Sequence, residues 1–201
     1  MDETQELKTE NPRRARRLEW IRAGLADPQA EVRAAAVRAL EHAERFQDLD
    51  RLLEQLKSEA TRDRIEAVYG LAGIGDDASM QPLVAALRDP VEDVRAAAIR
   101  TLAELLDEST LSPIVQCLDD SSTLVRREAV EALGRFGDRR LVPILRALLA
   151  EDGRDAELVG PLLRALGACR DERSEPEIAE YVAHADPAVR AAAIEALGQL
   201  D

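Results

Sequence analysis

The sequence predicts an all-α protein, an α/α superhelix (solenoid) of about six two-helix repeats. The first observation is a period of 31 residues, which is typical of stacked supersecondary units. One leucine marks each unit, with spacings of 31, 31, 31, 33 and 31, at Leu40, Leu71, Leu102, Leu133, Leu166 and Leu197. The second is composition, because 46% of the 201 residues are hydrophobic but only 2% are aromatic. Leu, Ala, Val and Ile therefore form the core, and Ala and Leu favour helices.

The unit at residues 80–106 shows how one repeat is built. Pro82 begins a short first helix at a position that needs no amide hydrogen, and Leu83 and Leu87 give it an apolar stripe. Asp89 and Pro90 then supply an N-cap and a first-turn proline for a longer second helix. Glycines such as those at 73, 75 and 137 mark turns between units.

Along the chain, the same template predicts six helix pairs in one array. First helices are expected to begin near Arg14, Asp48, Met80, Ser112, Leu141 and Glu175, and second helices near Pro28, Arg62, Pro90, Ser122, Ala156 and Pro187. The units span approximately 13–45, 46–75, 76–107, 108–138, 139–170 and 171–201, and the polar residues 1–12 are expected to form a mobile tail. Gly160 and Pro161 weaken a helix interior, so the fifth second helix is expected to start late or to be irregular.

The repeat pattern resembles a known family. Residues 87–102 read Leu-x-Asp-Pro-x-x-x-Val-Arg-x-Ala-Ala-x-x-x-Leu, with Gly-Asp at 75–76 and Pro-Leu at 82–83 ahead of it. This pattern is similar to the HEAT-like repeat of the phycobilisome-lyase (PBS lyase) type, and the similarity covers nearly all of the chain after residue 12. The resemblance implies the solenoid fold. Because such repeats serve scaffolds, assembly factors and a few enzymes, it implies less about function.

Charge and composition bear on several function classes. The formal net charge of −13 and the pI of about 4.7 argue against a broad grip on nucleic acid. Cys117 and Cys169 lack metal-ligand spacing, and alanine follows both His42 and His184, so no His-Glu pair is available to hold iron. We therefore expect no metal, no cofactor and no catalytic residue. The polar N-terminus predicts no signal peptide and no membrane insertion, so the expected protein is cytoplasmic and by default monomeric.

A repeated arginine follows a loop aspartate in several units. Each aspartate is expected to cap the second helix and to accept a hydrogen bond from the arginine, which gives both residues a structural role. The expected pairs are Asp27 with Arg33, Asp89 with Arg95, Asp120 with Arg126, and Asp186 with Arg190.

The exposed stripe of the second helices gives a column of residues one period apart. It contains Arg38, Tyr69, Arg100, Glu131, Arg164 and Glu195. The C-terminal members alternate in charge and are expected to neutralise one another. The N-terminal members do not, and Arg and Tyr are enriched in binding hot spots. One hypothesis is that Arg38, His42, Tyr69 and Arg100 contact an acidic or mixed peptide segment; the other is an ordinary solvated face.

These observations favour a protein-protein interaction or scaffolding module that uses the inner surface lined by the second helices. A chromophore (bilin) lyase or tetrapyrrole-handling subunit, implied by the resemblance, is the alternative. A DNA-binding or repair protein ranks third, because such a protein would be expected to have a basic groove with aromatic residues. The partner is expected to be a protein or peptide that the sequence does not identify.

Overall fold

The computed structural model describes residues 12–75, 77–151 and 156–200, and all regular secondary structure among them is helical. The chain forms two compact units, residues 1–51 and 52–201. The expected tail at residues 1–11 lies outside the described residues, and Pro12 is already the first residue of a helix.

The first unit contains helix α1 (Pro12–Ala23), a 3₁₀ turn (Gly24–Ala26) and most of helix α2 (Ala30–Gln55). A Cβ atom added to Gly24 would lie 3.0 Å from the Cβ of Ala36, so the end of α1 passes close to α2. Ala36 is accordingly buried.

The prediction of a separate helix starting near Asp48 is wrong, because α2 runs without a break through this position. Residues 41–48 contain no glycine or proline, and Glu, Ala and Arg in this segment favour helix. The other predicted starts each lie within three residues of the start of a helix in the structure. Pro82, which was expected to begin its helix, instead lies inside α4. The other connections between units carry a glycine, as at 75 and 137, or an aspartate that caps the following turn, as Asp107 and Asp171 do. Residues 41–48 form no such turn, and the helix continues through them.

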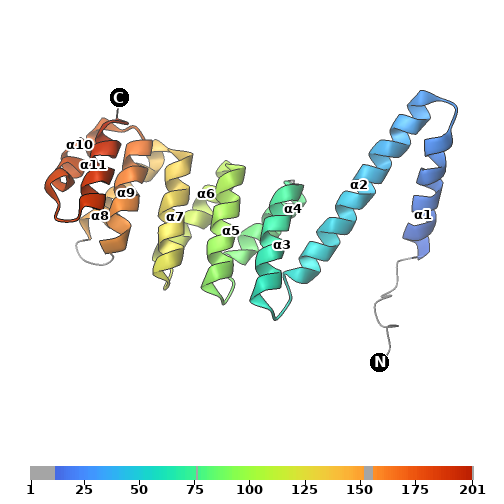
Figure 1. Ribbon diagram of the computed structural model, residues 1–201, viewed down its shortest axis with the longest axis horizontal. Helices are drawn as coiled ribbons and strands as arrows, with labels where there is room; N and C mark the ends of the chain where they lie inside the picture. The colour runs from blue at the N-terminus through green and yellow to red at the C-terminus, as the bar shows by residue number, and fades with distance from the viewer. Residues whose placement is uncertain (1–11, 76, 152–155, 201) are drawn as a thin grey trace. The chain divides into compact units, whose positions relative to one another are not determined.

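The second unit stacks its helices in two layers (Figure 1). The longer helices α3, α5, α7, α9 and α11 form one layer, in which each packs against the next. The shorter helices α4, α6, α8 and α10 form the other layer, and each packs against the long helix that follows it. The bounds are α3 Thr61–Ile74, α4 Asp77–Ala86, α5 Glu92–Leu105, α6 Leu111–Gln116, α7 Thr123–Phe136, α8 Val142–Ala150, α9 Ala156–Ala168, α10 Glu175–Ala179 and α11 Pro187–Leu197.

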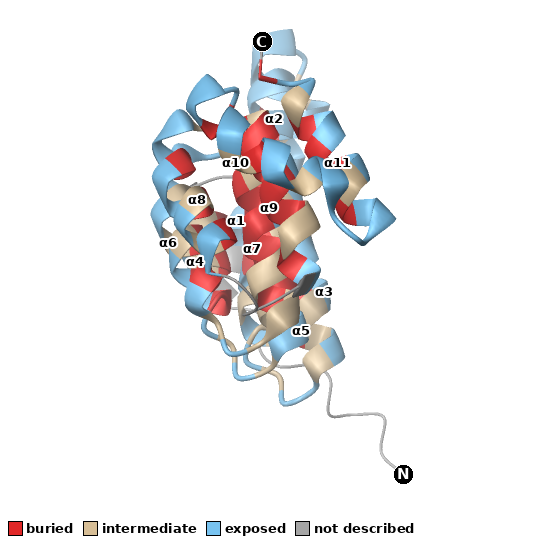
Figure 2. Ribbon diagram, turned by 90° about the vertical axis from the view of Figure 1, so that its left-hand side faces the viewer, coloured by how far each residue is buried: buried red, intermediate tan, exposed pale blue. Residues whose placement is uncertain are grey.

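The core of the second unit follows the long helices, as the buried residues in Figure 2 show. Four of the marker leucines, at positions 71, 102, 133 and 166, are completely buried. The position three residues before each of them is filled by Val68, Ile99, Val130 and Leu163, which are also 0% exposed. The period seen in the sequence is therefore the spacing of a continuous apolar core.

Long helices approach so closely that some positions tolerate only glycine. A Cβ atom added to Gly167 would lie 2.6 Å from the Cα of Ala196, and one added to Gly134 would lie 3.2 Å from the Cα of Ala165. In both cases the added Cβ atom would meet the backbone of the neighbouring helix. That backbone cannot move away without separating the two repeats.

The ends of four long helices share one backbone conformation. Gly75 and Gly137 have φ angles of 60° and 59°, and Leu106 and Arg170, at the equivalent repeat positions, both have φ of 50°. This left-handed conformation ends a helix and favours glycine. Turns between units are therefore alike even where the sequence lacks the glycine signal.

An arginine-aspartate clamp joins successive repeats. Nε and Nη2 of Arg95 donate to the two carboxylate oxygens of Asp120 at 2.8 and 2.7 Å, while Nη1 donates to the carbonyl oxygen of Asp89 at 2.9 Å. Arg64 binds the Asp89 carboxylate in the same bidentate way, at 2.8 and 3.0 Å. Each arginine thus fixes its own loop through carbonyl oxygens and the next loop through a carboxylate.

This geometry corrects the expected pairing. The arginine pairs with the aspartate of the following repeat, 25 residues later, because its Nη1 is occupied by carbonyls of its own loop. Nη1 of Arg33 and Nη1 of Arg190 also bind carbonyls of their own loops, at 2.8 Å. Arg126 donates to the Asp120 carbonyl and to the hydroxyl of Thr123. Arg64, which the expected pairs omit, is a full member of the series.

Of the predicted caps, Asp186 is the N-cap residue of α11, whereas Asp89 and Asp120 lie two residues before the N-cap residues Val91 and Ser122. The carboxylates of Asp27, Asp89, Asp120 and Asp186 each accept a hydrogen bond of 2.8 Å from the amide two residues later. Burial alone would raise the pKa of Asp120, but hydrogen bonds from Arg95 and from the Ser122 amide outweigh it. The pKa of Asp120 therefore lies below its ordinary value.

Helix α9 is continuous from Ala156 through Gly160 and Pro161, so the expected irregularity is absent from the helix itself. Pro161 sits in the second turn and is buried. A proline there removes one intrahelical hydrogen bond, but packing against α7 and α11 holds the helix in place.

Replacing Gly167 with alanine should lower stability by about 1–3 kcal/mol, because the new methyl group meets the backbone of α11. Gly73→Ala is the matched control: a Cβ atom there, near the C-terminal end of α3, meets nothing within 4 Å. The control should raise stability by about 0.5–1 kcal/mol through the lower entropy of the unfolded chain. Urea unfolding followed by circular dichroism measures both changes. Equal effects of the two changes would contradict the close approach of α9 and α11.

Arg95→Ala should destabilise the protein by about 1–3 kcal/mol, because it leaves the Asp120 carboxylate without its bidentate partner. The control Arg88→Ala, at an exposed position, should stay within about 0.5 kcal/mol of the wild type.

Asp120→Asn tests the same clamp through pH. Because the folded-state pKa of Asp120 is depressed, its contribution is fully present above its ordinary pKa of 3.8 and is lost as the pH falls through the lower folded value. The variant should therefore be less stable than the wild type at pH 7, and the difference should shrink below about pH 4. Thermal melts across this range measure it. A constant difference down to acid pH would contradict the ionised clamp.

Candidate functional site

The candidate site is the exposed face of the long helices in the second unit, which we call the second-helix face. The long helices lie side by side, so residues one repeat apart line up along this face. The face contains the predicted column residues Tyr69, Arg100, Glu131, Arg164 and Glu195.

At its N-terminal end, this face holds a hydrogen-bonded group rather than a free arginine. Nη2 of Arg100 donates to the hydroxyl oxygen of Tyr69 at 3.1 Å, and Nη1 donates to Oε1 of Glu128 at 2.9 Å. Glu128 is buried and Arg100 is half-buried, so this guanidinium joins α3, α5 and α7. Burial opposes the charge of Arg100, but the bonds to Tyr69 and Glu128 leave its pKa raised. Tyr69 keeps 47% of its surface exposed.

Arg38 and His42, the other two residues of the predicted site, lie on α2 in the first unit. Both are exposed, and the His42 ring meets the Phe46 ring edge-on at 4.7 Å. The structure therefore brings Tyr69 and Arg100 together but does not define where Arg38 and His42 lie relative to them.

The C-terminal members of the column do not form the expected ladder of ion pairs. Among the described residues, Glu131, Arg164 and Glu195 have no ion-pair partner. All three are exposed on α7, α9 and α11. The unmet charge therefore lies at the opposite end of the face from the one predicted.

Two adjoining hollows cover this C-terminal part of the face, with volumes of about 480 and 370 Å³. Glu131, Pro161 and Arg164 line both of them, so we treat them as one groove over α7, α9 and α11. Gly160 lines the groove where its neighbours in the repeat have side chains. A glycine followed by a proline leaves room above α9 and explains the hollow.

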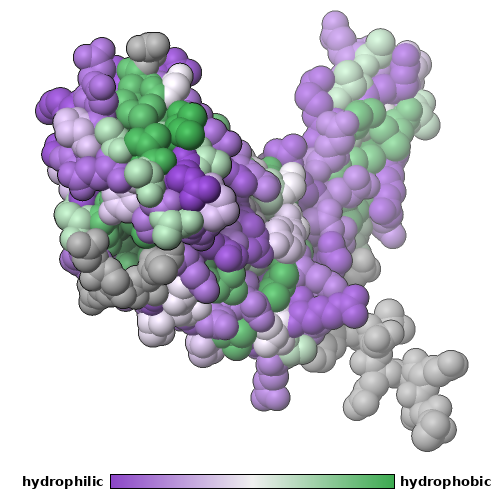
Figure 3. All heavy atoms as spheres, turned by 60° about the vertical axis from the view of Figure 1, so that its left-hand side comes forward, coloured by the Kyte–Doolittle hydropathy of each residue, from purple (hydrophilic) through white to green (hydrophobic). Residues whose placement is uncertain are grey.

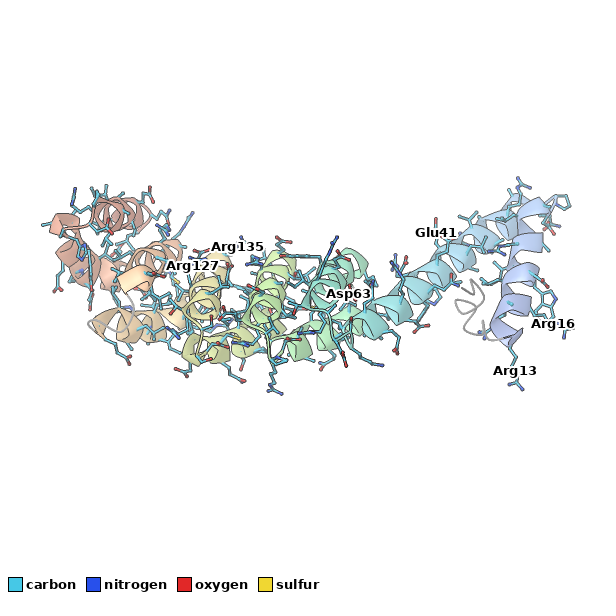
Figure 4. The ribbon with its side chains drawn as sticks, turned by 60° about the horizontal axis from the view of Figure 1, so that its bottom comes forward. Arg13, Arg16, Glu41, Asp63, Arg127 and Arg135 are labelled. Atoms are coloured by element: carbon cyan, nitrogen blue, oxygen red, sulfur yellow. The ribbon has the colours of Figure 1, made fainter. Side chains whose placement is uncertain are left out.

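The groove carries charges of both signs. Arg135 and Arg164 line it and lack an ion-pair partner among the residues that the structure describes. Arg127 lies 3.9 Å from Glu128, and Figure 4 shows Arg127 and Arg135 projecting from the same side of α7. The acidic lining consists of Glu131, Glu157 and Asp186. Such a surface suits a peptide with both carboxylate and cationic groups better than a uniformly charged polymer.

Sequence reasoning missed Glu128 and Arg135. Glu128 lies 28 residues after Arg100 and one helical turn before Glu131, the column residue of the next repeat. A carboxylate at that position was the signal for a partner of Arg100. The signal for Arg135 was a second arginine one turn after Glu131 on the same helical face.

Other kinds of site find no support in the described part of the chain. No cluster of three potential metal ligands occurs there, and no described helix is long and apolar enough to cross a membrane. Cys117 and Cys169 are buried, and desolvation raises the pKa of each thiol to about 11. Both are thus protonated at neutral pH, which does not suit a nucleophile.

Comparison with solved structures finds the same architecture in several proteins. Over 76% of this chain and 64% of the other, it is 26% identical, with a TM-score of 0.66, to a chain in the complex of CpcE and CpcF of phycocyanin lyase from Nostoc sp. PCC7120. The chain thus spans less than two thirds of that chain's length.

Designed armadillo repeat proteins share the fold at lower identity. One, in complex with the peptide (KR)4, is 22% identical with a TM-score of 0.57 over 92% of this chain and 99% of that one. Another, designed for modular peptide recognition, is 20% identical with a TM-score of 0.54 over 92% and 100%. No curated protein matches the sequence.

A family model describing HEAT repeats matches residues 18–95, 80–159 and 160–201. These matches run through both units and cover nearly everything after the first helix begins. The α/α solenoid, the clamp between repeats and this match agree, and the resemblance to the HEAT-like repeats of phycobilisome lyases is confirmed. The chain belongs to the HEAT-repeat family.

Proposed function

We propose that this protein is an interaction scaffold that binds an extended, mixed-charge peptide segment of a protein partner along the second-helix face. The observation that carries the proposal is the groove over α7, α9 and α11, where Arg135 and Arg164 stand exposed beside Glu131. Preformed surfaces of this kind bind with little ordering cost on the protein's own side.

The charges of the groove define the segment that fits. Arg135 and Arg164 offer forked donors for carboxylates of the partner, and Glu131 and Glu157 accept from a cationic side chain. The net charge of −13 disfavours a purely acidic partner at long range, whereas the groove disfavours a purely basic one locally. A segment with alternating signs satisfies both conditions.

This proposal keeps part of the site predicted from the sequence. It includes Tyr69 and Arg100, and it gives Arg38 and His42 a smaller part. Tyr69 offers an exposed aromatic ring that Arg100 orients through its hydroxyl. We propose that Tyr69 extends the binding surface, with Arg100 as the residue that positions it. Arg38 and His42 add a contact only for a partner that also reaches the first unit.

A displayed library of random peptides tests this function without a known partner. We expect the full-length protein to select peptides that contain at least one acidic and one basic residue. Arg135→Ala combined with Arg164→Ala should weaken the selected peptides at least tenfold, because arginines in desolvated pockets are frequent hot spots. Arg88→Ala, outside the groove, is the control and should bind like the wild type. Selected peptides that bind the wild type and the double variant with equal affinity would place the binding surface outside the groove.

A second candidate is a subunit of a bilin lyase. What favours it is the 26% identity to a chain in the CpcE–CpcF complex of phycocyanin lyase. If the protein handles a bilin, mixing it with phycocyanobilin should produce a shifted and intensified visible absorption band. An unchanged spectrum at excess protein would leave the scaffold as the sole candidate function.

A further inference from the structure

The two hollows of the groove lie at different levels of the long helices. The hollow of about 480 Å³ is lined by Gly134 and Arg135, near the end of α7, and by Ala168, the last residue of α9. The hollow of about 370 Å³ is lined by Glu157, near the start of α9, and by Ala188, near the start of α11. We call them the C-terminal hollow and the N-terminal hollow. The groove therefore extends along the direction of the long helices.

The charges of the groove are divided between these two ends. The two charged residues that line both hollows have opposite signs. Among the described residues, Arg135 is the one further charged residue that lines the C-terminal hollow. The N-terminal hollow adds Glu157, Asp186 and Arg127, and Arg127 lies 3.9 Å from the Glu128 carboxylate, which offsets part of its charge. One end of the groove therefore attracts a carboxylate and the other end attracts a cation.

The acidic end has capacity for a ligand. Glu157 and Asp186 are both exposed, and neither has an ion-pair partner among the residues that the structure describes. Oδ1 of Asp186 accepts from the Ala188 amide at 2.8 Å, which leaves its other carboxylate oxygen for a donor. Between the ends, the buried residues Pro161 and Ala165 supply an apolar floor. Figure 3 shows hydrophilic and apolar areas side by side on the surface of the second unit.

Helix geometry gives the distance between the two ends. A Cβ atom added to Gly134 would lie 3.2 Å from the Cα of Ala165, so these two residues are level with each other. Arg135 follows Gly134, and Glu157 precedes Ala165 on α9 by two helical turns, or about 12 Å along the axis. Both side chains tilt toward the N-termini of their helices, so this offset carries over to the charged groups. An extended peptide covers about 12 Å in three to four residues.

We propose that the groove selects its peptide by the spacing of two opposite charges. Arg135 binds an acidic residue in the C-terminal hollow, and Glu157 and Asp186 bind a basic residue, three or four positions away, in the N-terminal hollow. This selectivity rests on the proposed function. It adds the direction of the bound segment, which follows the long helices, and the distance between its charges. Arg135 and Glu157 are the residues that determine specificity.

Selection from one displayed library of random peptides, with the full-length wild type and two charge-reversal variants, tests the spacing. Wild-type peptides should be enriched about two- to fivefold in opposite charges three or four positions apart, compared with other spacings, because exposed ion pairs change affinity by such factors. Arg135→Glu should select two basic residues at this spacing, and Glu157→Arg should select two acidic ones. The matched controls Arg88→Glu and Glu172→Arg, at exposed positions outside the groove, should select the same peptides as the wild type.

Circular dichroism melts confirm that each variant is folded, as expected from the exposure of Arg135 and Glu157. A wild-type selection without a preferred spacing overturns the proposal. So does a folded charge-reversal variant that selects the same peptides as the wild type.

Failure of the proposed function gives a different result. Gly160→Leu fills the groove without a change of charge, because a Cβ atom at this position would lie 3.7 Å from Nη1 of Arg164. Peptides that bind this variant as tightly as the wild type lie outside the groove and contradict both the function and the spacing, as does a wild type that selects no peptide. Peptides that lose binding to Gly160→Leu but show no preferred spacing contradict the spacing alone.

Discussion

The structure depends on one packing constraint: each interior long helix must bury one side against the helix before it and the opposite side against the helix after it. Helices can meet on two sides at this distance only if small residues lie at the crossings. Gly134 faces Ala165 and Gly167 faces Ala196, and a methyl group at either glycine would touch the neighbouring backbone. The scarcity of aromatic residues follows from the same constraint, because large rings would separate the repeats.

Loops at one edge of the array keep these packed helices in register. A loop aspartate accepts from the amide two residues later and receives the arginine of the preceding repeat, so one carboxylate serves two contacts. The clamp is not required at every step. Ser58 replaces the aspartate in one loop and keeps the first contact, since its hydroxyl accepts from the Ala60 amide at 3.2 Å. Val159 stands at the arginine position in α9, which packs against α7 and α11 without a clamp arginine.

The sequence was sufficient to predict the helices because a period and its turn residues are local signals. It was insufficient near Asp48, where a missing turn signal let two predicted helices merge. It also assigned the Asp89 carboxylate to Arg95, which binds the Asp120 carboxylate and only the carbonyl of Asp89, since a residue 25 positions away and one 6 positions away look equally suitable along the chain. The partner of Arg100 was missed for a related reason. Glu128 lies one helical turn away from the column position, and only the packed helices bring it to the guanidinium.

The departures from the repeat matter most for function. Where the clamp is complete, Arg64 and Arg95 bind the carboxylates of Asp89 and Asp120 inside the array, and these groups offer little to a ligand. Where α9 carries Gly160 and Pro161, side chains that would fill the face are missing, a groove opens, and Arg164 is left without an ion-pair partner among the described residues. This array therefore exposes binding chemistry at its irregular helix, because the side chains that fill the face elsewhere are absent there.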